Sequence, residues 1–153
     1  MESTSYKFFV PGLPATAGSK RAIPFARMNG KLGVRVTDAC ERGKGWRSTV
    51  QAFALQAGVK PLSGPLHLRV KFQMPTPGYM HKGGKKNNEL KANAPTWHTT
   101  KPDATKLLRA VEDALTGIAW HDDAQICKQE VEKVYRVNEV GALVQITIVG
   151  GEG

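Results

Sequence analysis

Acidic side chains that could bind a metal ion are concentrated in one short part of this sequence. The 153-residue chain has 13 aspartate and glutamate residues against 22 lysine and arginine residues, a net charge of +9 at pH 7. Yet five of the acids lie close together, at Asp103, Glu112, Asp113, Asp122 and Asp123. Carboxylate oxygens are preferred ligands of Mg²⁺, which keeps its remaining positions for water and phosphate. We therefore predict a divalent-cation site in this stretch, of the kind that supports phosphodiester displacement.

A predicted helix places several polar residues along one side. From Asp103 to Leu115 the apolar residues recur at intervals of three and four, and Gly117 follows as a natural end. The apolar side holds Leu107, Leu108, Val111, Ala114 and Leu115. At about 100° per residue, Thr105, Arg109 and Glu112 fall within about 60° of one another on the opposite side. The helix therefore carries one polar stripe.

The turn after this helix could complete a metal site. Residues 121–125 (HDDAQ) form a tight turn before a predicted β-strand. The turn would return one of its two aspartates to the stripe if that strand packs beside the helix. Asp103 lies at the start of the helix, and Arg109 could neutralise charge on a phosphate. The spacing is therefore compatible with a site built from the helix and the turn.

Each of these residues also has a purely structural interpretation. An aspartate before a helix is most often only a cap, as Asp103 could be. Asp113 near a helix end is usually solvated, and an Asp-Asp pair before a strand is commonly just a turn. Arg109 could simply pair with Asp113 four residues later. His98 and His121 have no second histidine at ligand spacing, so we interpret both as surface or packing residues.

The remaining patterns indicate one domain of mixed secondary structure. Alternating apolar and polar residues predict a half-buried strand at 66–72, and three- and four-residue spacing predicts a helix at 46–57. Short β-rich runs predict further strands at 6–10, 126–137 and 142–149, the last two as a closing hairpin. This order favours an α+β (α/β) fold, a small mixed β-sheet flanked by two main helices. The chain length favours a single domain over residues 1–153.

Two basic segments are candidates for binding a polyanion. Residues 18–38 favour a strand pair or a loop with β character, and carry Lys20, Arg21, Arg27, Lys31 and Arg35. Residues 75–101 have many turn residues and five lysines against one acid, which predicts a mobile basic loop. Nucleic acid is therefore the expected partner. The expected DNA contacts are Lys20, Arg21, Lys82, Lys85, Lys86 and Lys101.

The cysteines and the hydropathy pattern indicate where in the cell the protein is expected. Cys40 and Cys127 are too far apart for a metal knuckle, so both are expected to be reduced thiols. No basic region followed by a long apolar stretch opens the sequence, and no window reaches the length of a bilayer span. We expect a cytoplasmic protein with no membrane partner and no nucleotide cofactor.

One extended pattern resembles a known family. Residues 101–126 read KPD-x-x-x-LLRA-x-x-DALTG-x-x-W-x-DDAQI, which looks like the signature of the RusA-type Holliday junction resolvases of phages and prophages. The basic GSKR segment at 18–21 and the strand at 66–72 fall in the order of that family. The resemblance implies a homodimer that binds a four-way DNA junction and makes paired nicks with Mg²⁺, or with Mn²⁺ in its place, in a bacterial host cell.

The resemblance also implies roles for single residues. Asp103 matches the first catalytic aspartate of the family motif, Asp123 matches the last, and Arg109 stands where the better-known members carry a catalytic lysine. Thr105 departs from the pattern, because the motif is PD-x-D-N where this chain has PDATK. Glu112, seven residues later on the same helical face, could replace the missing carboxylate. The expected catalytic residues are Asp103, Asp123, Arg109 and Glu112, and the expected metal ligands are Asp103, Asp123 and Glu112.

Three functions compete on this basis. The first is a metal-dependent, structure-selective endodeoxyribonuclease that resolves four-way and other branched DNA junctions. The second is a non-catalytic branched-DNA-binding protein whose metal site is degenerate because of Thr105. The third is a small basic RNA-binding protein, which the absence of an aromatic stacking motif disfavours. Mg²⁺-dependent nicking separates the first from the second.

Overall fold

A four-stranded sheet and two helices form the body of the protein. The computed structural model describes residues 5–17, 22–26, 32–36, 38–82 and 90–150. The helices are α1 (Asp38–Gln56) and α2 (Ala104–Leu115), and single 3-10 turns occur at η1 (Gly78–Met80) and η3 (Asp123–Gln125). The strands of the main sheet are β1 (Ser5–Pro11), β4 (Leu66–Pro75), β5 (Ile126–Arg136) and β6 (Gly141–Ile148).

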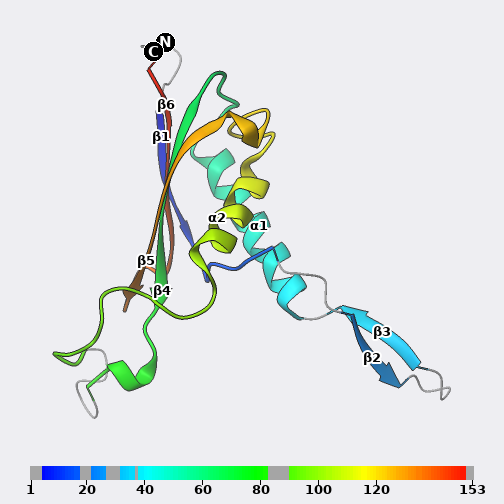
Figure 1. The fold of residues 1–153 in the computed structure, drawn as a ribbon, viewed down its shortest axis with the longest axis vertical. Helices are drawn as coiled ribbons and strands as arrows, with labels where there is room; N and C mark the ends of the chain where they lie inside the picture. Colours follow the sequence, from blue (N-terminus) through cyan, green and yellow to red (C-terminus); the bar gives the residue numbers. More distant parts are fainter. Residues whose placement is uncertain (1–4, 18–21, 27–31, 37, 83–89, 151–153) are drawn as a thin grey trace.

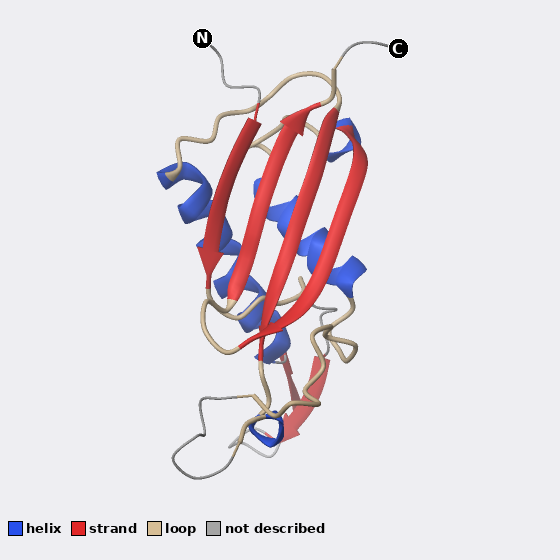
Figure 2. Cartoon of the chain, turned by 90° about the vertical axis from the view of Figure 1, so that its left-hand side faces the viewer, coloured by secondary structure: helices blue, strands red, loops and turns tan. Residues whose placement is uncertain are grey.

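The sheet is mixed, and α2 is part of the connection between its two parallel strands. The strand order is β1-β6-β4-β5, with β4 antiparallel to β6 and parallel to β5. Parallel neighbours need a crossover, because the chain must return to the edge where the first strand began. Here the chain leaves β4, passes through η1 and α2, and enters β5 after η3. Both helices lie on the same face of the sheet (Figures 1 and 2).

The core lies between that face and the helices. In β4 the alternation of the sequence turns Leu66, Leu68, Val70 and Phe72 towards the helices, and all four are buried. The apolar side of α2 meets them with Leu107, Val111 and Leu115. Burying each such side chain contributes roughly 1.5–3 kcal/mol. The apolar spacing of α2 therefore fixes which side of the helix stays available for polar chemistry.

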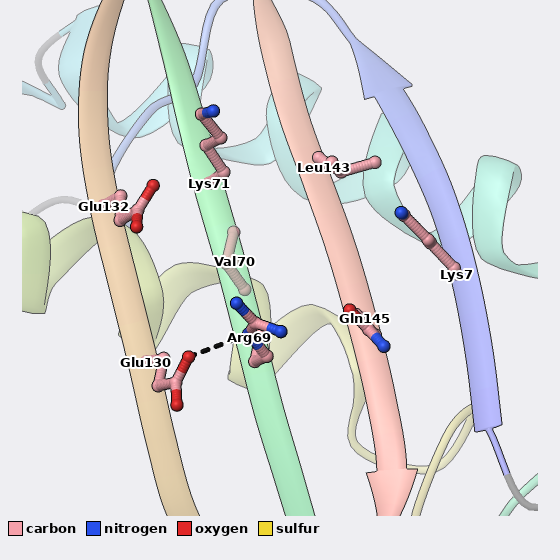
Figure 3. Close-up of a pocket in the computed structure, with 8 residues that line it drawn as sticks. All are labelled: Lys7, Arg69, Val70, Lys71, Glu130, Glu132, Leu143 and Gln145. Atoms are coloured by element: carbon pink, nitrogen blue, oxygen red, sulfur yellow. Dashed lines mark ion pairs between the residues drawn. The ribbon is translucent and has the colours of Figure 1, made fainter.

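The opposite face of the sheet is polar and open, as Figure 3 shows. Side chains from all four strands line a shallow depression of about 350 Å³ on this face, among them Lys7, Arg69, Glu130 and Gln145. The Nε atom of Arg69 lies 2.8 Å from Oε2 of Glu130 on the neighbouring strand. This face carries charges of both signs.

The prediction of a closing hairpin at the end of the chain is wrong. β5 and β6 follow each other in sequence, but β4 lies between them in the sheet. β6 therefore pairs with β4 on one side and with β1 on the other, and β5 lies beyond β4. The short connection suggested a hairpin, yet it crosses the end of β4 instead. Local sequence patterns identify strands but do not show which strands pair with each other in the sheet.

Of the two possibilities that the sequence left open for the basic segment after β1, the structure shows the strand pair. β2 (Ala22–Ala26) and β3 (Leu32–Val36) are antiparallel and make a separate two-stranded sheet. Figure 1 shows them beyond the start of α1, apart from the main sheet. α1 itself starts eight residues earlier than the apolar spacing predicted, at Asp38 and not Trp46. Among the described residues, neither helix combines the length and apolar character that crossing a bilayer requires.

Candidate metal and phosphate site

The polar stripe of α2 forms one wall of a groove of about 390 Å³. Thr105, Arg109 and Glu112 line it together, as their helical spacing requires. The remaining lining residues are Leu108 and Asp113 from the helix, Asp123 from the turn and Gln129 from β5. The groove therefore brings together three carboxylates and one guanidinium from α2 and the turn, and one amide from β5.

The two neighbouring aspartates of the turn have different environments. Asp122 caps η3, with its Oδ1 accepting a hydrogen bond of 2.9 Å from the backbone N–H of Ala124. Asp123 makes no such capping bond and lines the groove. The side chain of Asp122 therefore stabilises the turn itself, whereas that of Asp123 lies in the groove beside α2. Of the pair, only Asp123 lines the groove.

Gln125 holds this turn in place, a role that the sequence pattern did not predict. Its Oε1 accepts hydrogen bonds from the backbone N–H groups of His121 (2.9 Å) and Asp122 (3.0 Å). Its Nε2 donates to the carbonyl oxygens of Leu62 (2.9 Å) and Gly64 (3.0 Å), just before β4. The capping-box spacing Asp-x-x-Gln was visible in the sequence. Its tie to the approach of β4 is a tertiary contact with no local signal.

Glu112 lies at the centre of the electrostatics of the groove. Burial raises the pKa of its carboxyl above the ordinary value, and the charges of Asp123 and Asp113 raise it further. A hydrogen bond from Nε2 of Gln129 and the charge of Arg109 act in the opposite direction. The net shift of the Glu112 pKa is upward, mainly because burial removes the carboxylate from water. A cation bound beside Glu112 would favour the ionised form and oppose this shift.

Asp103 occupies the cap position of α2 without capping it. Its carbonyl oxygen accepts the first helical hydrogen bond, from Leu107 at 3.0 Å, but its side chain makes no capping bond. The carboxylate instead lies 3.6 Å from Nζ of Lys106 and is largely exposed. Asp103 is not among the residues that line the groove, although Thr105, two residues later, is. The interpretation of Asp103 as only a helix cap is therefore not supported, because its side chain does not cap α2.

Of the other candidate residues, those that the structure describes do not line the groove. His98 is buried and stacks at a tilt on Tyr135, with ring centroids 4.9 Å apart, and burial lowers its pKa. Lys82 and Lys101 are exposed. Lys20, Arg21, Lys85 and Lys86, and with them Arg27 and Lys31, lie outside the described residues, and the side chains of Arg35 and Cys40 are also not described. Cys127 is an exposed free thiol, and His121 is exposed.

The donor atoms at the groove fit a hard divalent cation in their chemistry. Glu112, Asp113 and Asp123 offer carboxylate oxygens, and Gln129 adds an amide. Within the described residues no three His, Cys, Asp or Glu side chains form a ready-made metal cage. Mg²⁺ is commonly held by one or two carboxylates, with water and substrate phosphate completing its shell. An open groove with few protein ligands is compatible with that mode of binding.

Comparisons with known proteins agree with this picture. The family model described as "Endodeoxyribonuclease RusA" matches residues 22–147, which include every residue that lines the groove. A relative from Bacillus subtilis (strain 168), "Uncharacterized protein YqaN", is 30% identical over 130 residues. That alignment covers 84% of this chain and 87% of the relative. The match over most of the sequence shows that the chain belongs to the RusA family of endodeoxyribonucleases.

Proposed function

We propose that this protein is a Mg²⁺-dependent endonuclease that resolves four-way DNA junctions by paired nicks. The observation that carries the proposal is the groove, where Glu112, Asp113 and Asp123 face Arg109 in a chain of net charge +9. Membership of the RusA family supports DNA as the substrate and branched DNA as its form. Charge of both kinds is needed, because the metal requires carboxylates and the phosphate requires a cation.

The residues of the groove divide this work. Asp123 and Glu112 are the proposed metal ligands, with Asp103 reaching the same ion from the start of α2. Mg²⁺, or Mn²⁺ in its place, would supply Lewis-acid stabilisation of charge during phosphodiester displacement. Arg109 binds the phosphate from the helix side. Gln129 orients Glu112 through its hydrogen bond.

Glu112 is proposed to compensate for Thr105. Both residues line the same groove, so a carboxylate missing at 105 can be replaced by one from 112. The two residues are seven positions apart, about 10 Å along the helix axis. A glutamate side chain that leans towards the helix N-terminus shortens that distance. On this proposal Thr105→Asp is tolerated, because the groove already accommodates carboxylates.

A non-catalytic protein that binds branched DNA is the alternative. Thr105 and the absence of a ready-made cage in the described residues favour it, because both reduce the number of protein ligands. The two functions share the fold, the basic surface and the substrate. They differ in one observable, since only the enzyme nicks a junction when Mg²⁺ is added.

The test is a nicking assay on a synthetic four-way junction with and without Mg²⁺, using a matched pair of variants. Asp123→Asn is expected to abolish cleavage and to leave junction binding intact or tighter, because it removes a ligand and a repulsive charge. Asp122→Asn is the control, because asparagine caps a turn as well as aspartate does. It should cleave at the wild-type rate. Binding without cleavage by the wild type would establish the alternative function.

We also propose that the active form is a symmetric homodimer. A four-way junction offers two equivalent strands, and a two-fold symmetric protein presents two identical sites to them. Light scattering at micromolar concentration should give twice the monomer mass. A monomer mass both with and without junction DNA would contradict the dimer.

A further inference from the structure

One residue of β5 holds both ends of the segment that leads to Asp103. The backbone carbonyl of Lys133 accepts a hydrogen bond of 3.0 Å from the N–H of His98. The Nζ atom of the same lysine donates to the carbonyl oxygens of Thr100 (2.8 Å) and Pro102 (2.7 Å). Lys133 therefore closes the loop from residue 98 to residue 102, and Asp103 is the next residue along the chain.

Lys133 lies in a strand that is hydrogen-bonded on both of its edges. β5 pairs with β4 along its length, and Lys133 lies opposite Phe72, which is fully buried. On the outer edge of β5, the backbone N–H of Tyr135 donates to the carbonyl of Thr96 at 2.9 Å. The approach to α2 is thus hydrogen-bonded to the sheet before the lysine side chain reaches across to it.

Lys133 and Gln129 project from the same face of β5. They are four residues apart, and side chains of a strand alternate between its two faces. Gln129 contacts Glu112 in the third turn of α2, and Lys133 holds the two carbonyls just before the helix. β5 therefore supports the polar stripe at both of its ends. The helix sits between these two supports.

The side chain of Asp103 makes few contacts that would hold it in one position. Its side chain makes no capping hydrogen bond, and among the described residues its ion-pair partner is Lys106, at 3.6 Å and on the exposed surface. Exposed ion pairs within a helix are weak and screened by salt. The position of Asp103 relative to the groove therefore depends on its backbone, and the carbonyl of Pro102 belongs to that backbone.

We propose that Lys133 is a positioning residue, which fixes the backbone before Asp103 so that this carboxylate can share a metal ion with Asp123. The proposal rests on the proposed function, because it gives Asp103 a role in metal binding. An ammonium group suits the task, since it donates several hydrogen bonds and those to carbonyl oxygens are strengthened by its charge. A lysine that acts this way need not touch DNA.

The experiment compares Lys133→Met with Lys128→Met. Both substitutions remove one positive charge from β5, but Lys128 is exposed and points to the opposite face. Lys133→Met is expected to lower kcat roughly 10–100-fold, the usual cost of losing a residue that orients a metal ligand. The KM for junction DNA should change no more than in Lys128→Met. Lys133→Arg, which keeps a charged donor, should recover much of the loss.

Two readouts do not require cleavage. Lys133→Met should weaken Mn²⁺ binding to the DNA-free protein, followed by electron paramagnetic resonance, and should speed hydrogen exchange of the peptide that contains residues 98–104. Lys128→Met should change neither. If Lys133→Met does not fold, Lys133→Gln replaces it, because its shorter side chain cannot span both carbonyls. A wild type that fails to cleave would refute the proposed function while these two readouts still test Lys133.

Three results would overturn the inference. Wild-type kcat and Mn²⁺ affinity in Lys133→Met would show that Asp103 is positioned without the lysine. Equal losses in Lys133→Met and Lys128→Met would show that charge alone matters. A loss confined to KM would make Lys133 an ordinary contact to the DNA backbone.

Discussion

At the scale of single residues, Glu112 is the group whose charge state decides the behaviour of the groove. Its raised pKa comes first from burial and then from the nearby charges of Asp123 and Asp113. The folded protein therefore binds a proton at Glu112 more readily than the unfolded chain does. Ionisation of Glu112 weakens folding, and on the proposed function the same ionised carboxylate binds the metal, so stability and metal affinity make opposite demands on it.

We predict that Glu112→Gln flattens the pH dependence of stability. In the wild type, the stability associated with protonated Glu112 is full below the ordinary glutamate pKa and is lost as pH rises through the raised folded pKa. Glutamine carries no proton to lose, so the melting temperature of the variant should not fall in this window. Its Mg²⁺-dependent cleavage should drop about as far as that of Asp103→Asn, and Thr105→Asp should partly restore it.

Glu132→Gln is the matched control for this prediction, because Glu132 is exposed on the open face of the sheet. It should keep both the wild-type melting profile and the wild-type cleavage rate. Calorimetry from acidic to neutral pH, with a nicking assay over a range of Mg²⁺ concentrations, measures both effects. Cleavage by Glu112→Gln at the wild-type rate at every Mg²⁺ concentration would remove Glu112 from the metal site.

The sequence predicted which face of α2 lines the groove, but not all of the residues that complete it. Thr105, Arg109 and Glu112 follow from helical spacing alone. The choice between the two aspartates of the turn depends on one hydrogen bond to Ala124, which spacing does not reveal. Gln129 joins the groove because β5 packs beside α2, and that is a tertiary contact.

At the scale of elements, the turn between α2 and β5 is tied to the approach of β4 by Gln125. The amide of this side chain donates to two carbonyls and accepts from two backbone N–H groups. Four hydrogen bonds from one side chain align the start of β5 with the start of β4. The turn that carries Asp123 is thereby positioned with the sheet.

We predict that Gln125→Glu loosens this turn. A carboxylate can still accept from the N–H groups of His121 and Asp122, but it cannot donate to the carbonyls of Leu62 and Gly64. Losing both donors should lower the free energy of unfolding by roughly 1–3 kcal/mol. Chemical denaturation measures this, and cleavage should fall with it because Asp123 moves. An unchanged unfolding midpoint would show that the amide bonds are dispensable.

Most elements were predictable from local patterns, whereas their arrangement was not. α2 and β4 follow from strong apolar periodicities that match their bounds within three residues. The first part of α1, from Asp38 to Gly45, has no apolar spacing, so its helical state was missed. The hairpin prediction failed because a short connection suggests pairing, while the partner of a strand depends on the whole sheet.

At the scale of the whole molecule, charge is unevenly distributed. The chain carries a net charge of +9, yet the groove holds three carboxylates and one arginine. On the proposed function, the basic surface attracts DNA while the carboxylates of the groove attract the metal ion. Binding and chemistry then have different dependences on salt, because counterion release governs only the first.

We predict that the affinity for junction DNA falls steeply with salt and that the basic segment 75–101 contributes to the slope. Replacing Lys82, Lys85 and Lys86 with alanine should reduce the log-log slope by about 0.9 for each DNA phosphate that these lysines neutralise in the wild type. The control replaces three exposed lysines elsewhere with alanine, at Lys7, Lys60 and Lys128. Fluorescence anisotropy across salt concentrations measures both. Equal slopes for the two triple variants would mean that the segment has no special contact with DNA.

The placement of β6 between β1 and β4 has a consequence for biosynthesis. Ser5 pairs with Thr147, so β1 finds its partner only after α2 and β5 have been made. Contacts this distant in sequence must overcome a large loop-closure entropy and form late. A nascent chain can thus contain the groove residues before it has the sheet that holds them in place. Translation order therefore delays assembly of the groove until β6 has emerged.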